Sequence, residues 1–462
     1  MALRDLLTRA RELAGHISVI DEVLVVTHID ADGITAGAVA LQALERAGFE
    51  SEILFVKQLD EERIESIADR NTFVWFTDLG SGQLDLIRKH QLDSQCIISD
   101  HHEPLENFRY QLNPHDFGFD GSTELSGATT TYLIAKHIGF ANTNRDLSAL
   151  SIVGAVGDLQ DSRTGRLEGL NRIVLKEATS CRVLAVERDL RFFGKQTRPV
   201  YKMLEYTFDP YLPGISGNEK GAIELLASLG IELKENGTWK HWIHLSRDEK
   251  KLVISEIVKV LVGNGASVRT IERIVGETYI LLNEEEGTEL RDAMEFSTLL
   301  NATARYGYEE IGLKVCMGDR GEALKEATML LRNHRRNLSD GLKLVDEIGM
   351  SELENIQYFH AGNMILDTIV GIVAGMSFSK ANLNKPIIAF AENEDGIKVS
   401  ARATQRLVER GVHLAEALRI AAEKVGGKGG GHSIAAGATI PKGSEEVFLK
   451  ELDRIVGAQL RS

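Results

Sequence analysis

The chain has 462 residues, a length that predicts two or three domains. Its formal net charge of −15 counts against a protein that coats nucleic acid, because such proteins are normally basic. An acidic enzyme still accepts a phosphodiester where metal ions and a few arginines supply a local positive field. The sequence holds no apolar run long enough to span a membrane, and its three widely spaced cysteines indicate a reducing, cytoplasmic compartment.

Strand and helix signals alternate over the N-terminal third of the chain. Continuous apolar runs predict strands at residues 23–27, 52–56, 72–77 and 95–99. Amphipathic or small-residue segments predict helices at residues 1–15, 35–47, 61–68, 83–90, 126–138 and 147–156. This alternation is typical of an α/β fold in which helices cover both faces of a parallel sheet. Ligands of such folds bind beyond the carboxyl ends of the strands.

Acidic and histidine side chains stand where these apolar runs end. They are His28, Asp30 and Asp32 before Gly33, then Asp78, then Asp100-His101-His102, and Asp158 after the helix at 147–156. Because the strand ends of a parallel sheet meet at one edge, we expect these residues to converge on a single site. Each residue has a structural alternative when it is taken alone. Asp32 is equally well explained as a helix cap, and Asp78 as part of a common Asp-x-Gly turn. Asp158 and Asp161 are equally well explained as capping residues. The four clusters in this order favour a centre for two metal ions.

The donor types of these clusters indicate the metal and the chemistry. Mixed carboxylate and imidazole ligands suit Mn²⁺, with Mg²⁺ or Co²⁺ as substitutes. Two such ions activate a nucleophile and neutralise a phosphoryl transition state. No thiolate accompanies the clusters, which argues against a structural zinc. The sequence therefore predicts a metal-dependent hydrolase.

The middle of the chain is predicted to be mostly helical. A crossing segment punctuated by prolines at residues 182–217 precedes predicted helices at 222–230, 248–263, 288–306 and 321–336. Arg332, His334, Arg335 and Arg336 form a basic group at the predicted end of the last helix. We interpret this group as a solvated last turn whose positive charges interact favourably with the helix dipole. A nucleic-acid contact is the alternative.

A further α/β unit is predicted to begin near Ile356. A hairpin is expected between residues 386–391 and 396–401, around Asn393-Glu394-Asp395-Gly396, and a helix at 414–425. That helix leads into a predicted loop of consecutive glycines that includes Gly429, Gly430 and Gly431 and ends at His432. Such glycines allow close approach to a ligand and offer N–H groups to a phosphate, with a flexible turn as the alternative. Arg402 supplies the geometry for a bidentate phosphate contact.

The order of these motifs resembles the DHH phosphoesterase superfamily, in the branch that carries the glycine-rich substrate-binding domain of RecJ-type exonucleases and oligoribonucleases. Residues 296–303 and 367–371 resemble archaeal RecJ-like proteins, which include nucleases that associate with the GINS replication complex. The resemblance implies a DHH catalytic domain at 1–180, a mostly helical part at 181–340 and a smaller C-terminal substrate-binding domain at 341–462. We expect the active site in a cleft between the first and last parts.

The resemblance also implies a role for each motif residue. His28, Asp30 and Asp78 would hold one metal, and Asp78 would bridge to a second held by Asp32, His101 and Asp158. His102 would position or protonate a phosphate oxygen, and Asp100 would orient the histidine pair. Arg402 and the run from Gly429 to His432 would hold the terminal nucleotide of the substrate.

The implied activity is a Mn²⁺-dependent exonuclease that releases mononucleotides from single-stranded DNA or RNA, in replication, repair or RNA trimming. One alternative is a nanoRNase or small (cyclic di)nucleotide phosphodiesterase, which would use the same metal site with a short cleft. Another is a scaffold that binds GINS or the replicative helicase. Every ligand position of the family pattern is filled, which argues against a purely structural role.

Overall fold

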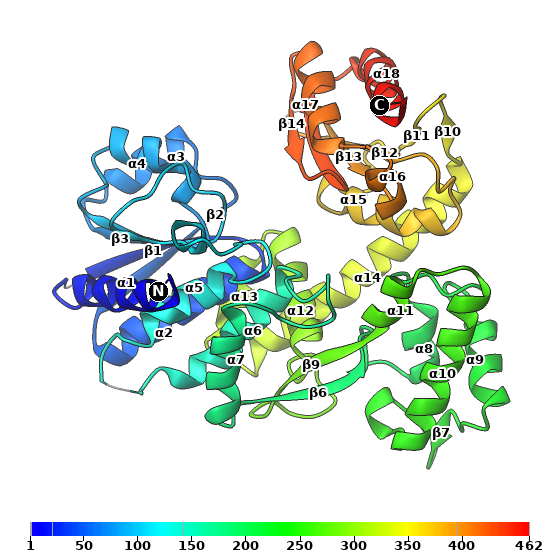
Figure 1. Ribbon diagram of the computed structural model, residues 1–462, viewed down its shortest axis with the longest axis horizontal. Helices are drawn as coiled ribbons and strands as arrows, with labels where there is room; N and C mark the ends of the chain where they lie inside the picture. The colour runs from blue at the N-terminus through cyan, green and yellow to red at the C-terminus, as the bar shows by residue number, and fades with distance from the viewer. Residues whose placement is uncertain (1, 21, 141, 395, 462) are drawn as a thin grey trace. The chain divides into compact units, whose positions relative to one another are not determined.

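The structure is a computed structural model that describes residues 2–20, 22–140, 142–394 and 396–461 (Figure 1). The chain divides into two compact units, Met1–Leu331 (unit 1) and Arg332–Ser462 (unit 2). Met1, expected to open the first helix, and Asp395, expected in the hairpin turn, lie outside the described residues. Within those residues, no helix is both long and apolar enough to cross a membrane.

Unit 1 begins with a five-stranded parallel sheet of strand order β2-β1-β3-β4-β5. Its strands are β1 (Glu22–His28), β2 (Glu50–Val56), β3 (Phe73–Thr77), β4 (Cys96–Ser99) and β5 (Gln111–Leu112). The predicted α/β class and the four predicted strands are confirmed. The fifth strand was not predicted, because its two residues are too short to form an apolar run.

Helices cover both faces of this sheet, as predicted. Val23 and Val25 of β1 join the hydrophobic core beneath α1 (Ala2–Ile17), α2 (Ala31–Ala47) and α5 (Gly127–Ala135). Leu24 and Val26 belong to the opposite core, with α3 (Glu61–Ala68) and α4 (Leu84–Lys89). Successive side chains of a strand point to opposite faces, so a continuous aliphatic run buries both.

The remainder of unit 1 is mainly helical and contains a third core. An antiparallel ribbon of β6 (Leu184–Leu190) and β9 (Val275–Leu281) brackets it. Met203, Leu226, Trp242 and Ile257 are central to this core. The helices are α6 (Ser148–Gly157), α7 (Asn171–Ser180), α8 (Val200–Glu205), α9 (Glu219–Ser228), α10 (Arg247–Gly263), α11 (Val268–Ile274), α12 (Ala293–Arg305) and α13 (Glu309–Cys316), with a hairpin of β7 (Lys234–Glu235) and β8 (Thr238–Trp239) between α9 and α10.

The predicted end of the helix at 321–336 is wrong. Helix α14 runs from Glu322 to Ile348, so the basic group of Arg332, His334, Arg335 and Arg336 lies inside it and not in a last turn. The apolar spacing continues past the charged run, because Leu338, Leu342 and Val345 join a hydrophobic cluster further along the helix. The charged residues of this run led to the prediction of a helix end, although the apolar periodicity continues beyond them.

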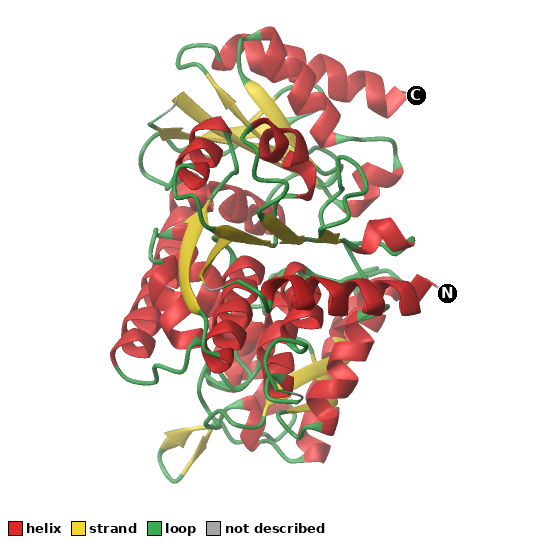
Figure 2. Cartoon of the chain, turned by 90° about the vertical axis from the view of Figure 1, so that its left-hand side faces the viewer, coloured by secondary structure: helices red, strands yellow, loops and turns green. Residues whose placement is uncertain are grey.

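Unit 2 is built on a six-stranded mixed sheet of order β10-β11-β12-β13-β15-β14. Helix α15 (Asp367–Met376) packs on one face, and α17 (Leu414–Lys424) and α18 (Glu445–Arg461) pack on the other (Figures 1 and 2). The expected hairpin is present, since β12 and β13 pair antiparallel with Asn393 opposite Gly396. The remaining elements are β10 (Ser351–Glu352), β11 (Gln357–His360), β12 (Ile387–Asn393), β13 (Gly396–Arg402), α16 (Gln405–Glu409), β14 (Lys428–Gly431) and β15 (Ala435–Ile440).

The glycine run is an edge strand, which corrects the predicted loop. Lys428–Gly431 pairs antiparallel with β15, and the chain turns back at His432, whose N–H donates to the carbonyl of Ala435 (2.8 Å). Gly429 lies so close to α17 that a Cβ there would stand 2.9 Å from the carbonyl oxygen of Leu418. The glycines therefore serve close packing of strand on helix as well as backbone exposure at the sheet edge.

Candidate metal centre

The carboxyl edge of the N-terminal sheet gathers the acidic and histidine residues. His28 is the last residue of β1, Asp78 follows β3, and Asp100 follows β4. Asp30 caps α2, because its carboxylate accepts the N–H of Gly33 (2.9 Å). The capping residue is thus Asp30 and not Asp32, which lies in the first turn of the helix and is free to face the cluster.

A first group of donors surrounds His28. Its Nδ1 lies 3.1 Å from Oδ2 of Asp30 and 3.8 Å from Oδ2 of Asp78. One ligand atom of each of these three residues lies within 4.8 Å of the others, a spacing that one cation spans. Burial disfavours the charged imidazole, but the hydrogen bond and charge of Asp30 outweigh burial and raise the pKa of His28 to about 9.

A second group surrounds His101. Its Nε2 lies 3.3 Å from Oδ1 of Asp78 and 3.7 Å from Oδ2 of Asp32, and its Nδ1 lies 3.8 Å from Oδ2 of Asp158. Asp32, His101 and Asp158 again place one donor each within 4.8 Å. Asp78 stands between the two groups, with one carboxylate oxygen toward each histidine.

Asp78 carries the strongest sign that a cation belongs here. Its side chain is 2% exposed, and its polar neighbours are the imidazoles of His101, 3.3 Å from Oδ1, and His28, 3.8 Å from Oδ2. Burial and the charge of Asp32 raise the pKa of Asp78 well above its ordinary value, and burial raises the pKa of Asp158 to about 7. Two buried carboxylates side by side, Asp78 and Asp32, repel each other, and a divalent cation between the donor groups removes that cost. The oxygen-rich set with imidazole donors fits Mn²⁺ or Mg²⁺.

The start of helix α5 holds Asp32 in place. Its carboxylate accepts hydrogen bonds from the N–H groups of Gly127 (2.7 Å) and Ala128 (3.0 Å) and from the hydroxyl of Ser126 (2.9 Å). Gly127 also makes room, since a Cβ there would lie 2.2 Å from Oδ1 of Asp78. In α6, a Cβ on Gly154 would lie 2.5 Å from Oδ1 of Asp32. Neither glycine was predicted from the sequence, because what each contributes is the space that a Cβ would fill.

A polar layer behind the centre orients His101 and Asp158. Nδ1 of His101 lies 2.7 Å from the carbonyl oxygen of Gly121, an acceptor that directs Nε2 toward Asp78. Gln160 donates both to that carbonyl (2.8 Å) and to Asp158 (2.9 Å), and Asn171 donates to Gln160 (2.6 Å). Gln160 stands two residues after Asp158, so it lay within the motif itself, but neither amide carries a spacing that predicts a supporting role.

Asp100 and His102 form a pair beside the cluster. Asp100 is buried and accepts hydrogen bonds from the N–H groups of Ser81 (2.9 Å) and His101 (2.7 Å) and from Nδ1 of His102 (2.8 Å). Although burial opposes ionisation, these bonds hold the pKa of Asp100 below its usual range. The hydrogen bond from Asp100 raises the pKa of His102 to about 9. The imidazole of His102 is 59% exposed, so a protonated donor faces outward beside the acidic cluster.

The remaining predicted residues lie elsewhere. Asp161 is not part of the cluster, because it forms a buried ion pair with Arg191 (2.6 Å). In unit 2, Arg402 stands opposite Ala435 across the β13–β15 pair, next to the turn at His432 that ends the glycine strand. Its guanidinium lies against Gly371 of α15, where a Cβ would be 2.6 Å from Nη2. Arg402, Gly429, Gly430, Gly431 and His432 thus belong to one region of the unit 2 sheet.

Three stretches of the sequence match known domains in the order of the fold. Residues 22–154 match the DHH family, N-terminal domain, residues 192–275 the DHH-CID domain, and residues 355–458 the DHHA1 domain. The parallel sheet with its acidic edge, the helical middle and the mixed C-terminal sheet together define a DHH phosphoesterase fold. The chain belongs to the DHH family, which confirms the resemblance found in the sequence.

Over nearly its whole length the chain is similar to the uncharacterized protein MJ0831 of Methanocaldococcus jannaschii. The two are 33% identical over 449 residues, which cover 95% of this chain and 94% of its relative.

Solved structures share the fold at low sequence identity. RecJ of Thermus thermophilus in complex with Mn²⁺ matches 97% of this chain with a TM-score of 0.60 and 17% identity, and the chain spans 55% of its length. A second exonuclease RecJ bound to manganese gives a TM-score of 0.60 and 16% identity, covering 97% of this chain and 94% of the other. CDC45 of Entamoeba histolytica gives a TM-score of 0.66 and 12% identity, covering 98% of both chains.

Proposed function

We propose that this protein is a Mn²⁺-dependent exonuclease that hydrolyses single-stranded DNA or RNA to mononucleotides. The observation that carries the proposal is the buried carboxylate of Asp78, which stands between His28 and His101 with one oxygen toward each donor group. His28, Asp30 and Asp78 would hold one ion, and Asp78, Asp32, His101 and Asp158 the other. When bound, the ions supply charge neutralisation at the phosphoryl group and activate the attacking water. RecJ, which shares the fold, binds Mn²⁺ and Mg²⁺ in its crystal structures.

The chain's own residues complete the reaction. The oxygen of water forms a bond to phosphorus and its proton passes to solvent, while the bond from phosphorus to the sugar oxygen breaks. Protonated His102 donates its Nε2–H to the leaving sugar oxygen, and buried Asp100 holds the imidazole through Nδ1. Arg402 and the strand that ends at His432 bind the terminal phosphate. The products are a nucleoside monophosphate and a strand one nucleotide shorter.

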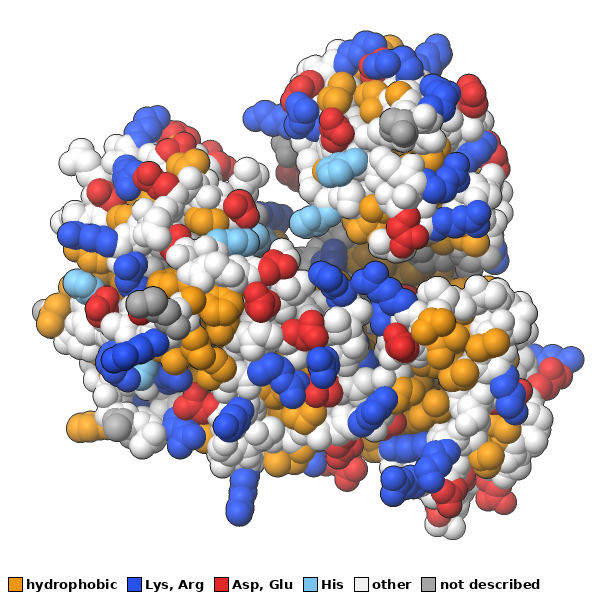
Figure 3. All heavy atoms as spheres, viewed as in Figure 1, with side chains coloured by type: hydrophobic (Ala, Val, Ile, Leu, Met, Phe, Trp, Pro, Cys, Tyr) orange, Lys and Arg blue, Asp and Glu red, His pale blue; other side chains and the backbone are white. Residues whose placement is uncertain are grey.

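Two further roles have their own support. A phosphodiesterase for short oligonucleotides fits the net charge of −15 and the interspersed acidic and basic side chains on the face seen in Figure 3. A role beside GINS or the replicative helicase fits the fold shared with CDC45 and the resemblance to GINS-associated nucleases. The free thiols of Cys96, Cys181 and Cys316 favour the cytoplasm as the compartment.

A time course with end-labelled single strands tests the proposal. DNA and RNA of two to about thirty nucleotides are incubated with Mn²⁺ and full-length protein, beside Asp78→Asn and the exposed control Asp69→Asn. Stepwise shortening of long strands that only Asp78→Asn abolishes supports the exonuclease and reveals its polarity and sugar preference. Cleavage confined to the shortest oligomers favours the phosphodiesterase. If no length is cleaved although Mn²⁺ binds, the proposal fails and a scaffold role is the better account.

A further inference from the structure

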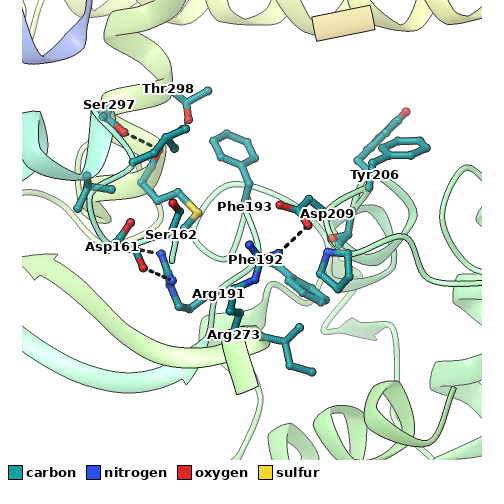
Figure 4. Close-up of a pocket in the computed structure, with 18 of the residues that line it drawn as sticks. Asp161, Ser162, Arg191, Phe192, Phe193, Tyr206, Asp209, Arg273, Ser297 and Thr298 are labelled. Atoms are coloured by element: carbon teal, nitrogen blue, oxygen red, sulfur yellow. Dashed lines mark hydrogen bonds and ion pairs between the residues drawn. The ribbon is translucent and has the colours of Figure 1, made fainter. Parts of the chain in front are cut away.

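A cavity of about 340 Å³ lies in unit 1 beside the candidate metal centre (Figure 4). Gly157 and Leu159, which flank Asp158, form part of its wall at the end of α6. Asn301 of α12 forms another part, and its Oδ1 accepts the N–H of Ala31 (3.0 Å), between the proposed ligands Asp30 and Asp32. Two walls of the cavity are therefore one residue away from the metal-binding side chains.

Aromatic rings line the wall that the DHH-CID region contributes. Phe192, Phe193, Tyr206 and Phe208 come from the segment after β6 and from the end of α8. The guanidinium carbon of Arg198 lies 4.8 Å from the ring centroid of Phe193 and 5.0 Å from that of Tyr206, so one cation bridges both rings. Aromatic side chains offer flat apolar faces on which a planar group stacks.

The two arginines that line the cavity are already neutralised. Arg191 pairs with Asp161 at 2.6 Å, and Arg273 pairs with Asp209 at 3.0 Å, as the dashed lines in Figure 4 show. The charges of these two lining arginines are matched by two carboxylates, and the third cation nearby, Arg198, lies against the rings of Phe193 and Tyr206. The ligand group that this lining suits is therefore planar and uncharged.

Polar atoms stand across the cavity from the rings. Figure 4 shows Ser162, Ser297 and Thr298 on the side opposite Tyr206. The Nδ2 group of Asn301 has no hydrogen-bond partner within the part of the chain that the structure describes. A planar group with apolar faces and polar edges would stack on the aromatic wall and form hydrogen bonds with the polar wall. Nucleobases have this character. The volume lies near the lower end of the roughly 300–1,000 Å³ of small-ligand pockets, which suits a single nucleoside.

We infer that this cavity receives the nucleobase of the nucleotide whose phosphate lies at the metal centre. The inference rests on the proposed function and assigns to it a base-binding subsite, formed by Phe193 and Tyr206 on one side and by Asn301 and Ser162 on the other. A stacked base beside the metal ligands fixes the position of the scissile phosphate. It also makes the rate depend on the presence of a base at that nucleotide.

The test replaces Tyr206, which is 45% exposed, by alanine and compares it with Tyr211→Ala. Tyr211 is a matched control, because it is 40% exposed, belongs to the same region and does not line the cavity. The KM is measured for oligonucleotides with a normal or an abasic residue at the cleaved end. We expect Tyr206→Ala to raise the KM for the normal substrate about 5- to 150-fold, the loss of one base–aromatic stack, and to leave the abasic substrate unchanged.

Tyr206→Phe should restore the KM, and Phe193→Leu, which keeps an apolar side chain, should reproduce part of the loss. Tyr211→Ala should behave as wild type with both substrates. Equal effects of Tyr206→Ala on normal and abasic substrates, or no effect on either, would overturn the inference.

Equilibrium binding separates this inference from the proposed function. Adenosine 5′-monophosphate and ribose 5-phosphate, which lacks a base, are titrated into the full chain by calorimetry. Base-dependent binding that Tyr206→Ala removes, in a protein that cleaves no oligomer, would support the subsite and refute the exonuclease. Cleavage by a protein that binds both ligands equally well would support the exonuclease and refute the subsite.

Discussion

Gly127→Ala should abolish the candidate metal centre by adding a single methyl group. Gly127 is the first residue of α5, and a Cβ there would lie 2.2 Å from Oδ1 and 2.6 Å from Cβ of Asp78. The nearest atoms include Cβ of Asp78, so a rotation of the carboxylate alone does not relieve the overlap. The carboxylate must move by about 1 Å, and a displacement of that size costs about 100-fold in rate. Overpacking of this kind should also lower the free energy of unfolding by about 1–3 kcal/mol.

Two measurements check this prediction, the rate of oligonucleotide cleavage and the thermal unfolding temperature with and without Mn²⁺. An ion present at 100 times its dissociation constant stabilises the wild-type protein by about 2.7 kcal/mol, and Gly127→Ala should lose most of that gain. The control is Gly15→Ala in α1, where a Cβ meets nothing within 4 Å. That variant should match the wild-type rate and gain up to about 1 kcal/mol from helix propensity. A Gly127→Ala protein that cleaves and binds Mn²⁺ like wild type would refute this account of the site.

Three further predictions concern other parts of the protein. Arg191→Ala leaves Asp161 buried without its partner, so the free energy of unfolding in urea should fall by about 3–5 kcal/mol. The double variant Arg191→Met/Asp161→Asn should recover most of that loss. A loss below about 1 kcal/mol would contradict the buried pair. His102 has a pKa of about 9 because of Asp100, so Asp100→Asn should move that pKa toward 6.5. His102 then loses its proton between pH 6.5 and 9, and kcat should fall across this window in the variant but not in wild type; identical pH profiles would exclude His102 as the acid. If Arg402 holds the substrate phosphate as proposed, Arg402→Lys loses the bidentate contact, so KM should rise about tenfold with kcat nearly unchanged. An unaltered KM would remove Arg402 from the substrate site.

The sequence predicted the sheet well because its strands are buried on both faces. Strands β1, β3 and β4 are continuous apolar runs, and the structure places their ends within one residue or so of the expected positions. Strand β14 was not foreseen, since glycine has little strand preference and the strand exists through its pairing with β15. Helix α14 was predicted too short, because its charges outweighed its apolar spacing.

The acidic and histidine residues of the candidate site were equally visible, and the structure brings six of them together around Asp78 and His101. Their surroundings were not visible. Gly127 and Gly154 contribute the space that a Cβ would fill, and Gln160 and Asn171 contribute hydrogen bonds that hold Asp158 and the carbonyl of Gly121. No local pattern encodes either kind of contribution, since both depend on which elements the fold places side by side.

The backbone of Asp78 has a further consequence for how this lineage can change. Its φ of +61° lies in the left-handed region, which disfavours a side chain by roughly 1 kcal/mol relative to glycine. Its buried charge adds to that burden in the metal-free protein. Asp78→Gly or Asp78→Asn would relieve one or both costs while removing the bridge between the two donor groups. The backbone at this position therefore favours glycine or asparagine at least as much as aspartate, so the fold alone does not select the aspartate, and its retention depends on the role proposed for its carboxylate.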